Sequence, residues 1–422
     1  MFQKIFSNSM IYVLSLLFNK GLTFLLLPVL TYYLTKEDFG VLGLVTAIST
    51  IASIYIGFFP SGFLLARYAQ YGKEKMAEYI HHILLLTLAT TSLVLLILIG
   101  FQNILLPDHV GNRTMLMVII TLYSVFSIFF RFIDTILQVE QNVLKFAVLQ
   151  TFQSVASLAL GFLLIIEFSY GWEGKYYAEL LILFLIFIYT INYIIKNKYY
   201  KYNTDYKKLK ELFVFLFPLT FSVLGLYLMG TIDRIFISNM LGLESAGIYN
   251  VALTMAIIIN MVYDSITKAI NPILYQNLAK DKYENNKKVV KIIYIYSILC
   301  VGISAVFILL LPYIFNIMIN DKFIDALVLI PFLAVGFTFE GLRKALEAPL
   351  VFKNKVKSLA VLTLFAGLIN IVLNYILIHK YGLNGAAYST LISFLVLYIA
   401  TFFLLVKEIK LPWIFVKNKS DY

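Results

Sequence analysis

The chain has 422 residues, of which 61% are hydrophobic and 14% charged, and its formal net charge is +11. Soluble domains carry about 25% charged residues, so a chain this apolar could not hide its nonpolar surface in a water-soluble core. Lipid must therefore solvate most of it. The basic residues cluster in short loops on one side of the expected helices, which is typical of a membrane protein and argues against nucleic-acid binding.

Apolar runs of membrane-spanning length follow one another along the chain, separated by short polar breaks. The first begins like a signal peptide, but no small-residue cleavage site follows, so we interpret it as an uncleaved helix. The pattern predicts an all-α membrane protein with about twelve transmembrane helices. Their expected spans are 8–33, 39–66, 78–102, 114–139, 144–168, 176–195, 211–238, 244–271, 289–317, 326–348, 357–379 and 384–406.

The loop charges support this number of helices. Twelve helices place both termini on one side, where 27 Lys and Arg residues then gather, against six on the other side. The remaining basic residue, Lys20, lies inside the first helix. Because basic loops stay in the cytoplasm, both termini are predicted to be cytoplasmic.

The chain divides near its midpoint. Residues 197–210 form the richest basic segment and separate six expected helices from six, which predicts bundles at 1–196 and 211–422 joined by a cytoplasmic linker. The halves also resemble each other, since Gly40 and Gly247 occupy matching turns at a constant offset of 207 residues. This match indicates a duplicated six-helix unit with a two-fold axis along the membrane normal.

Enzyme motifs are missing from the sequence. There is no nucleotide-binding GxxxxGK[ST] loop, no HExxH and no GxSxG. The single cysteine, Cys300, and the four histidines have no metal-ligand spacing. We therefore expect a protein that is not an enzyme, with no catalytic residues, metal or cofactor.

Several short motifs carry a resemblance to a known family. In chain order they are Asn19-Lys20-Gly21 followed by Pro28, LTKEDFG at 34–40, Arg67-Tyr68, Asp233-Arg234, LGLESAGIY at 241–249 and YGLNGAA at 381–387. With these motifs, nearly the whole chain resembles the Wzx-like polysaccharide flippases, a branch of the superfamily that also holds the MATE exporters and lipid II flippases.

The resemblance implies a MATE-like fold, in which two six-helix bundles rock around a central cavity. It implies the flipping of an undecaprenyl-diphosphate-linked oligosaccharide across the bacterial inner membrane, for O-antigen (lipopolysaccharide), capsule or exopolysaccharide assembly. Polysaccharide polymerase and chain-length proteins would then be further partners. The motifs do not specify which sugar repeat is carried.

Three cations within or at the ends of membrane helices are candidate contacts for the substrate diphosphate. A charge in mid-bilayer costs roughly 2.5–3.5 kcal/mol on insertion scales, so such a residue faces water or a partner. Lys20 either contacts the diphosphate or pairs with an acid on another helix. Arg67 is either an interfacial anchor or a headgroup contact. Asp233 and Arg234 point about 100° apart, so one of them should face the cavity or the other bundle.

Carboxylates within the helices are candidates for coupling transport to a proton or sodium gradient: Asp134, Asp233 and Asp264. The first and third have simpler interpretations, because Arg131–Asp134 and Asp264–Lys268 have the spacing of ion pairs on one helix face. Near the end of the tenth helix, Glu340, Arg343, Lys344 and Glu347 indicate an interfacial charge cluster. Asn370 and Asn374 indicate hydrogen bonds between helices.

Two other functions compete with the flippase. A drug or metabolite exporter of the MATE type would prefer an anionic cavity, whereas Lys20 favours an anionic substrate. A membrane polysaccharide polymerase would share the hydropathy pattern, but such enzymes need a large outer loop that this chain does not offer. Glycosyltransferase genes next to the gene for this protein would favour the flippase over the other two functions.

Overall fold

The computed structural model describes residues 18, 19, 21, 22, 24–58, 60–107, 110–203, 205–280 and 282–413, without the side chains of 69, 218, 219, 221 and 222. Within these ranges every regular element is a helix, which confirms the predicted all-α class. The helices are α2 (Leu27–Tyr33), α3 (Lys36–Tyr55), η1 (Ile56–Phe58), α4 (Pro60–Gly100), α5 (Gln102–Leu105), α6 (Arg113–Val139), α7 (Val143–Ile166), α8 (Trp172–Lys196), α9 (Tyr206–Leu241), α10 (Leu243–Leu278), α11 (Tyr283–Met318), η2 (Asp321–Phe323), α12 (Ala326–Phe352), α13 (Val356–Tyr381) and α14 (Leu383–Glu408).

Ten helices in the described ranges are long and apolar enough to cross a membrane. They correspond to ten of the expected spans. The expected seventh span is α9, whose 36 residues extend over about 54 Å. The expected first span, 8–33, lies mostly outside the described residues.

The prediction of one continuous helix over the second span, 39–66, is wrong. It breaks at η1, where Gly57 and Phe58 both have positive φ values, 70° and 52°. A bulky residue rarely adopts this conformation. The side chain of Thr90 compensates for the lost helical bonding by accepting a hydrogen bond from the Gly57 N–H at 2.8 Å. An apolar run therefore predicted the membrane segment but not the break inside it.

The described residues divide into two compact units. Unit 1 holds those up to Leu224 together with Ile237–Gly247, and unit 2 holds Gly225–Phe236 together with those from Ile248 onward. Both α9 and α10 contribute to each unit. The predicted bundle boundaries at 196 and 211 stay a prediction.

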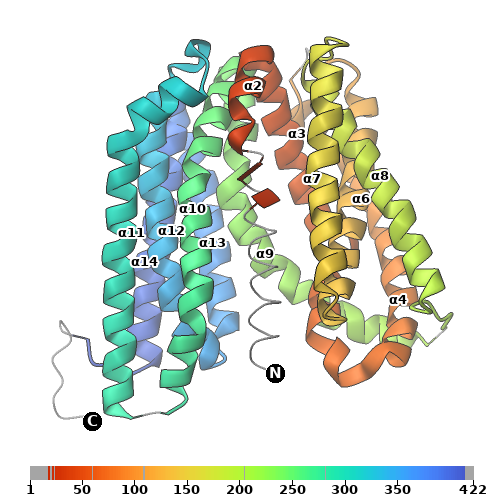
Figure 1. Cartoon of the computed structure of the whole chain (residues 1–422), viewed down its shortest axis with the longest axis vertical. Helices are drawn as coiled ribbons and strands as arrows, with labels where there is room; N and C mark the ends of the chain where they lie inside the picture. The colour runs from red at the N-terminus through yellow and green to blue at the C-terminus, as the bar shows by residue number, and fades with distance from the viewer. Residues whose placement is uncertain are drawn as a thin grey trace. The chain divides into compact units, whose positions relative to one another are not determined.

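Unit 1 packs α6 against α3, α4 and α8, and α7 against α8 (Figure 1). Its core is built from aromatic and aliphatic side chains, including Phe63, Tyr79 and Ile133. The start of α3 is fixed by a capping box, in which the Asp38 carboxylate accepts from the Thr35 backbone N–H at 2.9 Å. The same carboxylate accepts from the Trp172 N–H at 3.1 Å, so it also fixes the start of α8. This double role explains why an acid suits that position of the LTKEDFG motif.

The segment expected to be a linker is held against unit 1. Residues 206–210 already belong to α9. Before them, Lys201 forms an ion pair with Glu78 at 2.7 Å, which raises the pKa of Lys201. The Tyr199 hydroxyl donates to Glu140 at 2.5 Å. Burial, reinforced by Glu140, raises the pKa of Tyr199, so this phenol stays protonated and keeps donating at neutral pH.

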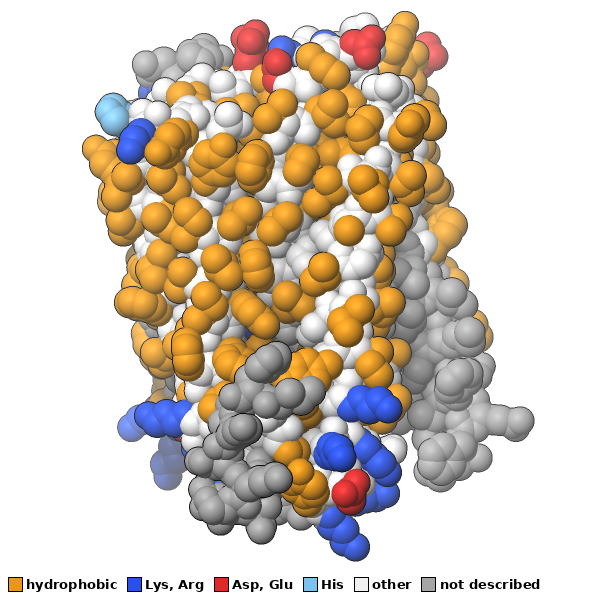
Figure 2. All heavy atoms as spheres, turned by 90° about the vertical axis from the view of Figure 1, so that its left-hand side faces the viewer, with side chains coloured by type: hydrophobic (Ala, Val, Ile, Leu, Met, Phe, Trp, Pro, Cys, Tyr) orange, Lys and Arg blue, Asp and Glu red, His pale blue; other side chains and the backbone are white. Residues whose placement is uncertain are grey.

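In unit 2, α12 packs against α11 and α14, and α13 packs against α14 (Figure 1). The face of unit 2 in Figure 2 is a broad apolar band between two charged ends. One end carries mainly basic side chains, and the other carries most of the acidic ones. Such a band is what hydrocarbon requires, and the unequal ends match the predicted positive-inside asymmetry of this half.

The two glycines at offset 207 make reciprocal contacts within unit 1. A Cβ on Gly40 would overlap the Leu243 carbonyl oxygen, and a Cβ on Gly247 would overlap the Lys36 carbonyl oxygen. Residues 36 and 243 are themselves related by the same offset. A two-fold axis between the glycines would produce this reciprocity. The close approach of each glycine to a carbonyl oxygen explains why only glycine fits at either position.

Candidate functional site

The charged and polar side chains that the sequence singled out fall into separate places. Lys20 lies outside the described residues. Arg67 lies on α4, between η1 and the break at Gly72. Its guanidinium donates to Gln70 at 2.8 Å and lies 5.3 Å from the centre of the Phe215 ring. Its Nε is buried without a hydrogen-bond partner in the described part of the chain.

Asp134 lies on α6 in unit 1 and is almost fully buried. Gln150 on α7 donates to one carboxylate oxygen, and the other oxygen is buried without a partner in the described ranges. Arg131 instead donates to Ser53 on α3 at 2.7 Å. The expected pairing of Arg131 with Asp134 is therefore wrong, because both side chains turn toward neighbouring helices rather than toward each other.

Asp233 is the most enclosed of the candidate carboxylates, with 1% of its surface exposed. It lies on the α9 segment that belongs to unit 2. Its Oδ2 accepts from Tyr249 of α10 at 2.6 Å and from Thr390 of α14 at 2.9 Å. Its Oδ1 accepts from Asn374 of α13 at 2.6 Å. Three neutral donors from three helices thus converge on one buried carboxylate.

The surroundings of Asp233 are rich in oxygen atoms. The Asn374 side-chain oxygen is buried and has no partner among the described residues. Asn370 donates to Ser389 and Ser393 of α14 at 3.3 and 3.2 Å, which agrees with the expected hydrogen bonding between helices. Oxygen atoms of carboxylate, amide and hydroxyl groups are ligands for hard cations. The oxygen atoms of this cluster could therefore bind a proton or coordinate a small cation.

Arg234, the neighbour of Asp233, is directed elsewhere. Its Nε is buried without a hydrogen-bond partner in the part of the chain that the structure describes. Successive residues on a helix point about 100° apart, so Asp233 enters the polar cluster while Arg234 does not. The expectation that one of this pair faces the cavity or the other bundle stays a prediction, since the described contacts of Asp233 all lie within unit 2.

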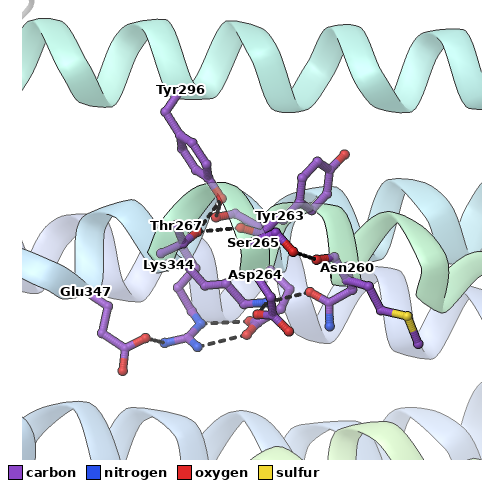
Figure 3. Close-up of polar contacts among 12 residues, drawn as sticks. Asn260, Tyr263, Asp264, Ser265, Thr267, Tyr296, Lys344 and Glu347 are labelled. Atoms are coloured by element: carbon purple, nitrogen blue, oxygen red, sulfur yellow. Dashed lines mark hydrogen bonds and ion pairs between the residues drawn. The ribbon is translucent and has the colours of Figure 1, made fainter. Parts of the chain in front are cut away.

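Asp264 lies on α10, 15 residues after Tyr249, which corresponds to about 22 Å along the helix. It pairs with Lys344 of α12, whose Nζ is 2.5 Å from Asp264 Oδ1. The same ammonium donates to Asn260 at 2.6 Å. Figure 3 shows Asp264, Asn260 and Lys344 converging, while Thr267 and Tyr296 meet on another side of α10. The expected pairing of Asp264 with Lys268 is wrong, because Lys344 is the partner.

Arg343 precedes Lys344 and has a different environment. It donates to both oxygens of Glu340, at 2.7 and 2.9 Å, and its Nη1 is 3.0 Å from Glu347. Only 4% of its side chain is exposed. The charges at 340–347 were expected to form one interfacial cluster. The structure instead pairs Arg343 with the buried Glu340 and with Glu347, whose side chain is 35% exposed, while Lys344 pairs with Asp264 of α10.

The sequence did not single out three residues of these sites: Tyr249, Asn260 and Thr390. It placed Lys344 in a charge cluster at 340–347 but gave no sign that the partner of Lys344 is Asp264, 80 residues earlier. A hydroxyl or amide on an apolar helix is common, so no local pattern distinguishes these residues. The tyrosine of LGLESAGIY was part of a quoted motif, which was the one available signal for Tyr249.

Two family models match the chain. One, described as "Polysaccharide biosynthesis protein", matches residues 5–278, and one described as "MatE" matches residues 218–376. An uncharacterized membrane protein of Haemophilus influenzae is 24% identical over 276 residues, 64% of this chain and 65% of the relative. The match thus spans just under two thirds of that relative. The "Lsg locus putative protein 1" of the same organism is 22% identical over 284 residues, 66% of this chain and 68% of the relative.

Solved structures share the fold at low sequence identity. A multidrug resistance MATE family transporter in an inward-facing conformation has a TM-score of 0.73 at 16% identity, covering 92% of this chain and 94% of that one. The lipid II flippase MurJ, in an inward closed conformation, also has a TM-score of 0.73, at 13% identity, covering 95% and 87%. The MATE-like fold expected from the motifs is confirmed.

Proposed function

We propose that this chain, which belongs to the polysaccharide biosynthesis protein family and has a MATE-like fold, is a flippase for a lipid-linked oligosaccharide. The substrate would be a polyprenyl diphosphate, such as undecaprenyl diphosphate, that carries an oligosaccharide repeat. Flipping would run from the cytoplasmic to the periplasmic leaflet of a bacterial inner membrane. The product would serve O-antigen, capsule or exopolysaccharide assembly, where a polymerase and chain-length proteins would take it up.

One observation carries this proposal furthest: the family match covers residues 5–278 of a chain whose described helices bury ionisable side chains. Ionisable residues within membrane helices are costly and mark substrate or ion pathways. Lys20, Arg67 and Arg234 are the proposed cationic contacts for the diphosphate. An ammonium or a guanidinium suits a phosphate, and a cation on the path would lower the cost of taking the diphosphate through about 30 Å of hydrocarbon.

The proposed driving force is a proton or sodium gradient, which acts through a buried carboxylate. Among Asp134, Asp233 and Asp264, the surroundings favour Asp233. Its hydrogen-bond partners are neutral, and an unpaired amide oxygen of Asn374 lies in the same cluster. Asp264 is already engaged by an ammonium, which would compete with a coupling cation. Asp134 has a single donor and one unpartnered oxygen among the described residues, so it ranks second.

The test is reconstitution of the purified protein in vesicles that contain an undecaprenyl-diphosphate-linked oligosaccharide. Flipping is measured as the exposure of the sugar to a membrane-impermeant glycosidase or lectin. We expect flipping with wild type and its loss with Lys20→Gln, while Lys20→Arg keeps part of the activity because the charge survives. Absence of flipping by wild type with each imposed gradient would overturn the proposal.

A MATE-type exporter is the second candidate, because the MatE model matches 218–376. It would bind amphipathic cations rather than diphosphates. Export of a fluorescent cationic dye from the same vesicles distinguishes the two functions. Dye export without sugar exposure would favour the exporter.

A further inference from the structure

Arg67 has an unusual setting for a cation at the end of a membrane helix. Its guanidinium carbon lies 5.3 Å from the centre of the Phe215 ring, and its Nη1 donates to Gln70 at 2.8 Å. Its Nε is buried and has no hydrogen-bond partner among the described residues. An aromatic ring attracts the face of a guanidinium and leaves the N–H donors at its edge unused. Arg67 is therefore held in place while it keeps donors for an anion.

A carboxylate lies within electrostatic range of Arg67 but is bound by other groups. Glu211 of α9 accepts from the Tyr71 hydroxyl at 2.7 Å through one oxygen and from the Tyr79 hydroxyl at 2.6 Å through the other. The two phenol rings are stacked, with their centres 5.3 Å apart. Arg67 is near enough to act on the charge of Glu211. Two neutral donors thus occupy both oxygens of an acid that would otherwise compete for the guanidinium.

The spacing of these residues shows that only a small movement would bring the acid and the cation together. Tyr71 follows Arg67 by four residues on α4, and Phe215 follows Glu211 by four residues on α9. Side chains at this spacing are neighbours on a helix, with Cβ atoms about 6 Å apart. The two helices therefore meet through two adjacent contacts, Arg67 with Phe215 and Tyr71 with Glu211. Rotation of the Glu211 side chain would carry its carboxylate from the phenols to the guanidinium.

The depth of Arg67 fits a lipid headgroup. The 20 residues of α3 cover about 30 Å, which is the thickness of the hydrocarbon. Arg67 follows the last residue of α3, Tyr55, by about three further helical turns of chain, so it lies near the inner boundary of the hydrocarbon. Ionisable groups at this boundary face water or headgroups rather than acyl chains. A guanidinium there has the geometry to form two parallel hydrogen bonds to a phosphate.

We propose that Glu211 and its two tyrosines are positioning residues that keep Arg67 available for the diphosphate of the lipid-linked substrate. The phenols hold the carboxylate, and Phe215 supports the guanidinium, so the phosphate meets a cation that this acid does not already occupy. The inference rests on the proposed function, in which Arg67 is one of the diphosphate contacts.

Freeing the carboxylate should weaken binding of the diphosphate. In the double variant Tyr71→Phe/Tyr79→Phe, Glu211 loses both donors and competes for Arg67, so the Kd should rise roughly two- to fivefold. This range corresponds to an exposed ion pair, and Glu211 is exposed. Adding Glu211→Gln should return the Kd to within about twofold of wild type, because the competing charge is gone. A merely structural network would not recover when a third member is removed.

Two further variants make the result specific. In an Arg67→Gln background, where the Kd should already be raised, the tyrosine changes should have no further effect. Tyr193→Phe is the matched control, since it removes a phenol that donates to a different carboxylate of unit 1, Glu140. The other cation beside the freed carboxylate is Lys75, 4.3 Å from the centre of the Tyr71 ring. Capture of the carboxylate by Lys75 would leave the Kd unchanged and would overturn the proposal.

The measurement is binding of undecaprenyl diphosphate to the full-length protein in detergent, by native mass spectrometry or thermophoresis, with dioleoyl-phosphatidylglycerol as the second probe. Thermal unfolding checks that each variant is folded, and Tyr71→Phe alone replaces the double variant if that is unstable. A loss of binding that Glu211→Gln reverses supports the positioning role. Unchanged binding, a loss that Glu211→Gln does not reverse, or an equal loss with Tyr193→Phe overturns it.

The second probe tests which lipid the site recognises. Shifts confined to undecaprenyl diphosphate support the assignment to the substrate, and equal shifts with phosphatidylglycerol overturn that assignment. Flipping by wild type in vesicles is scored separately, so this inference can fail while the proposed function stands.

Discussion

Asp233 and Asp264 both lie in unit 2, and each depends on α10: Asp233 accepts a hydrogen bond from Tyr249 of α10, and Asp264 lies on α10 itself. The two carboxylates are nevertheless stabilised in different ways. Asp233 is enclosed and accepts three hydrogen bonds from neutral side chains. Asp264 is partly exposed and is neutralised by an ammonium. No cation is among the hydrogen-bond partners of Asp233, whereas Lys344 already balances the charge of Asp264. A role in binding a coupling cation therefore suits Asp233 better than Asp264.

The largest expected effect separates the buried Arg343–Glu340 pair from the Lys344–Asp264 pair beside it. Glu340→Ala leaves Arg343 buried with only Glu347 as a partner, which should cost about 3–5 kcal/mol. Asp264→Ala should cost less, about 1 kcal/mol, because Asp264 is partly exposed and Lys344 keeps its hydrogen bond to Asn260. Thermal unfolding in detergent, followed by intrinsic fluorescence, measures both. Equal losses of stability would show that Lys344 is as dependent on its carboxylate as Arg343 is.

Replacing each aspartate with asparagine should show that only Asp233 is needed for coupling to an ion gradient. Asp233→Asn keeps the shape but weakens the acceptor for Tyr249, Thr390 and Asn374, so it should cost about 1–3 kcal/mol. It should also abolish the dependence of flipping on an imposed ion gradient. Asp264→Asn is the matched control and should preserve that dependence. Gradient-driven flipping that survives Asp233→Asn would shift the coupling role to Asp134.

The first turn of α10 uses neither arrangement, because a glycine there allows close backbone contact with the start of α3. Gly40→Ala and Gly247→Ala should each cost about 1–3 kcal/mol, since the added methyl group has no space against a carbonyl oxygen. The two losses should agree within about 0.5 kcal/mol if a two-fold axis relates the sites. Gly302→Ala is the control, because a Cβ there meets nothing within 4 Å. Unequal losses would argue against the internal repeat.

The smallest expected effect concerns the exposed cation near Asp264. Lys268→Gln removes no contact that the described structure contains, so unfolding stability should change by no more than about 0.5 kcal/mol. A large loss of stability would instead mean that Lys268 has a structural partner.

The sequence by itself determined the class of the protein and most helix boundaries. The spans expected at 114–139 and 144–168 agree closely with α6 and α7. The agreement has a simple cause: the hydrocarbon thickness fixes the length of each apolar run, and polar residues must interrupt the runs outside it. The quoted motifs likewise identified the family, and the offset of 207 identified the glycines that turn out to be in reciprocal contact.

Only the tertiary structure decided which polar groups meet. Local spacing paired Asp134 with Arg131 and Asp264 with Lys268, but the actual partners are Gln150 and Lys344, on other helices. Spacing along one helix shows which side chains share a face, and it cannot show what the next helix brings to that face. The sequence did not predict the break at Gly57 for the same reason, because the hydrogen bond that compensates for it comes from Thr90, 33 residues away. In a membrane helix, where hydrocarbon offers polar groups no solvent, the choice of partner is made by helix packing.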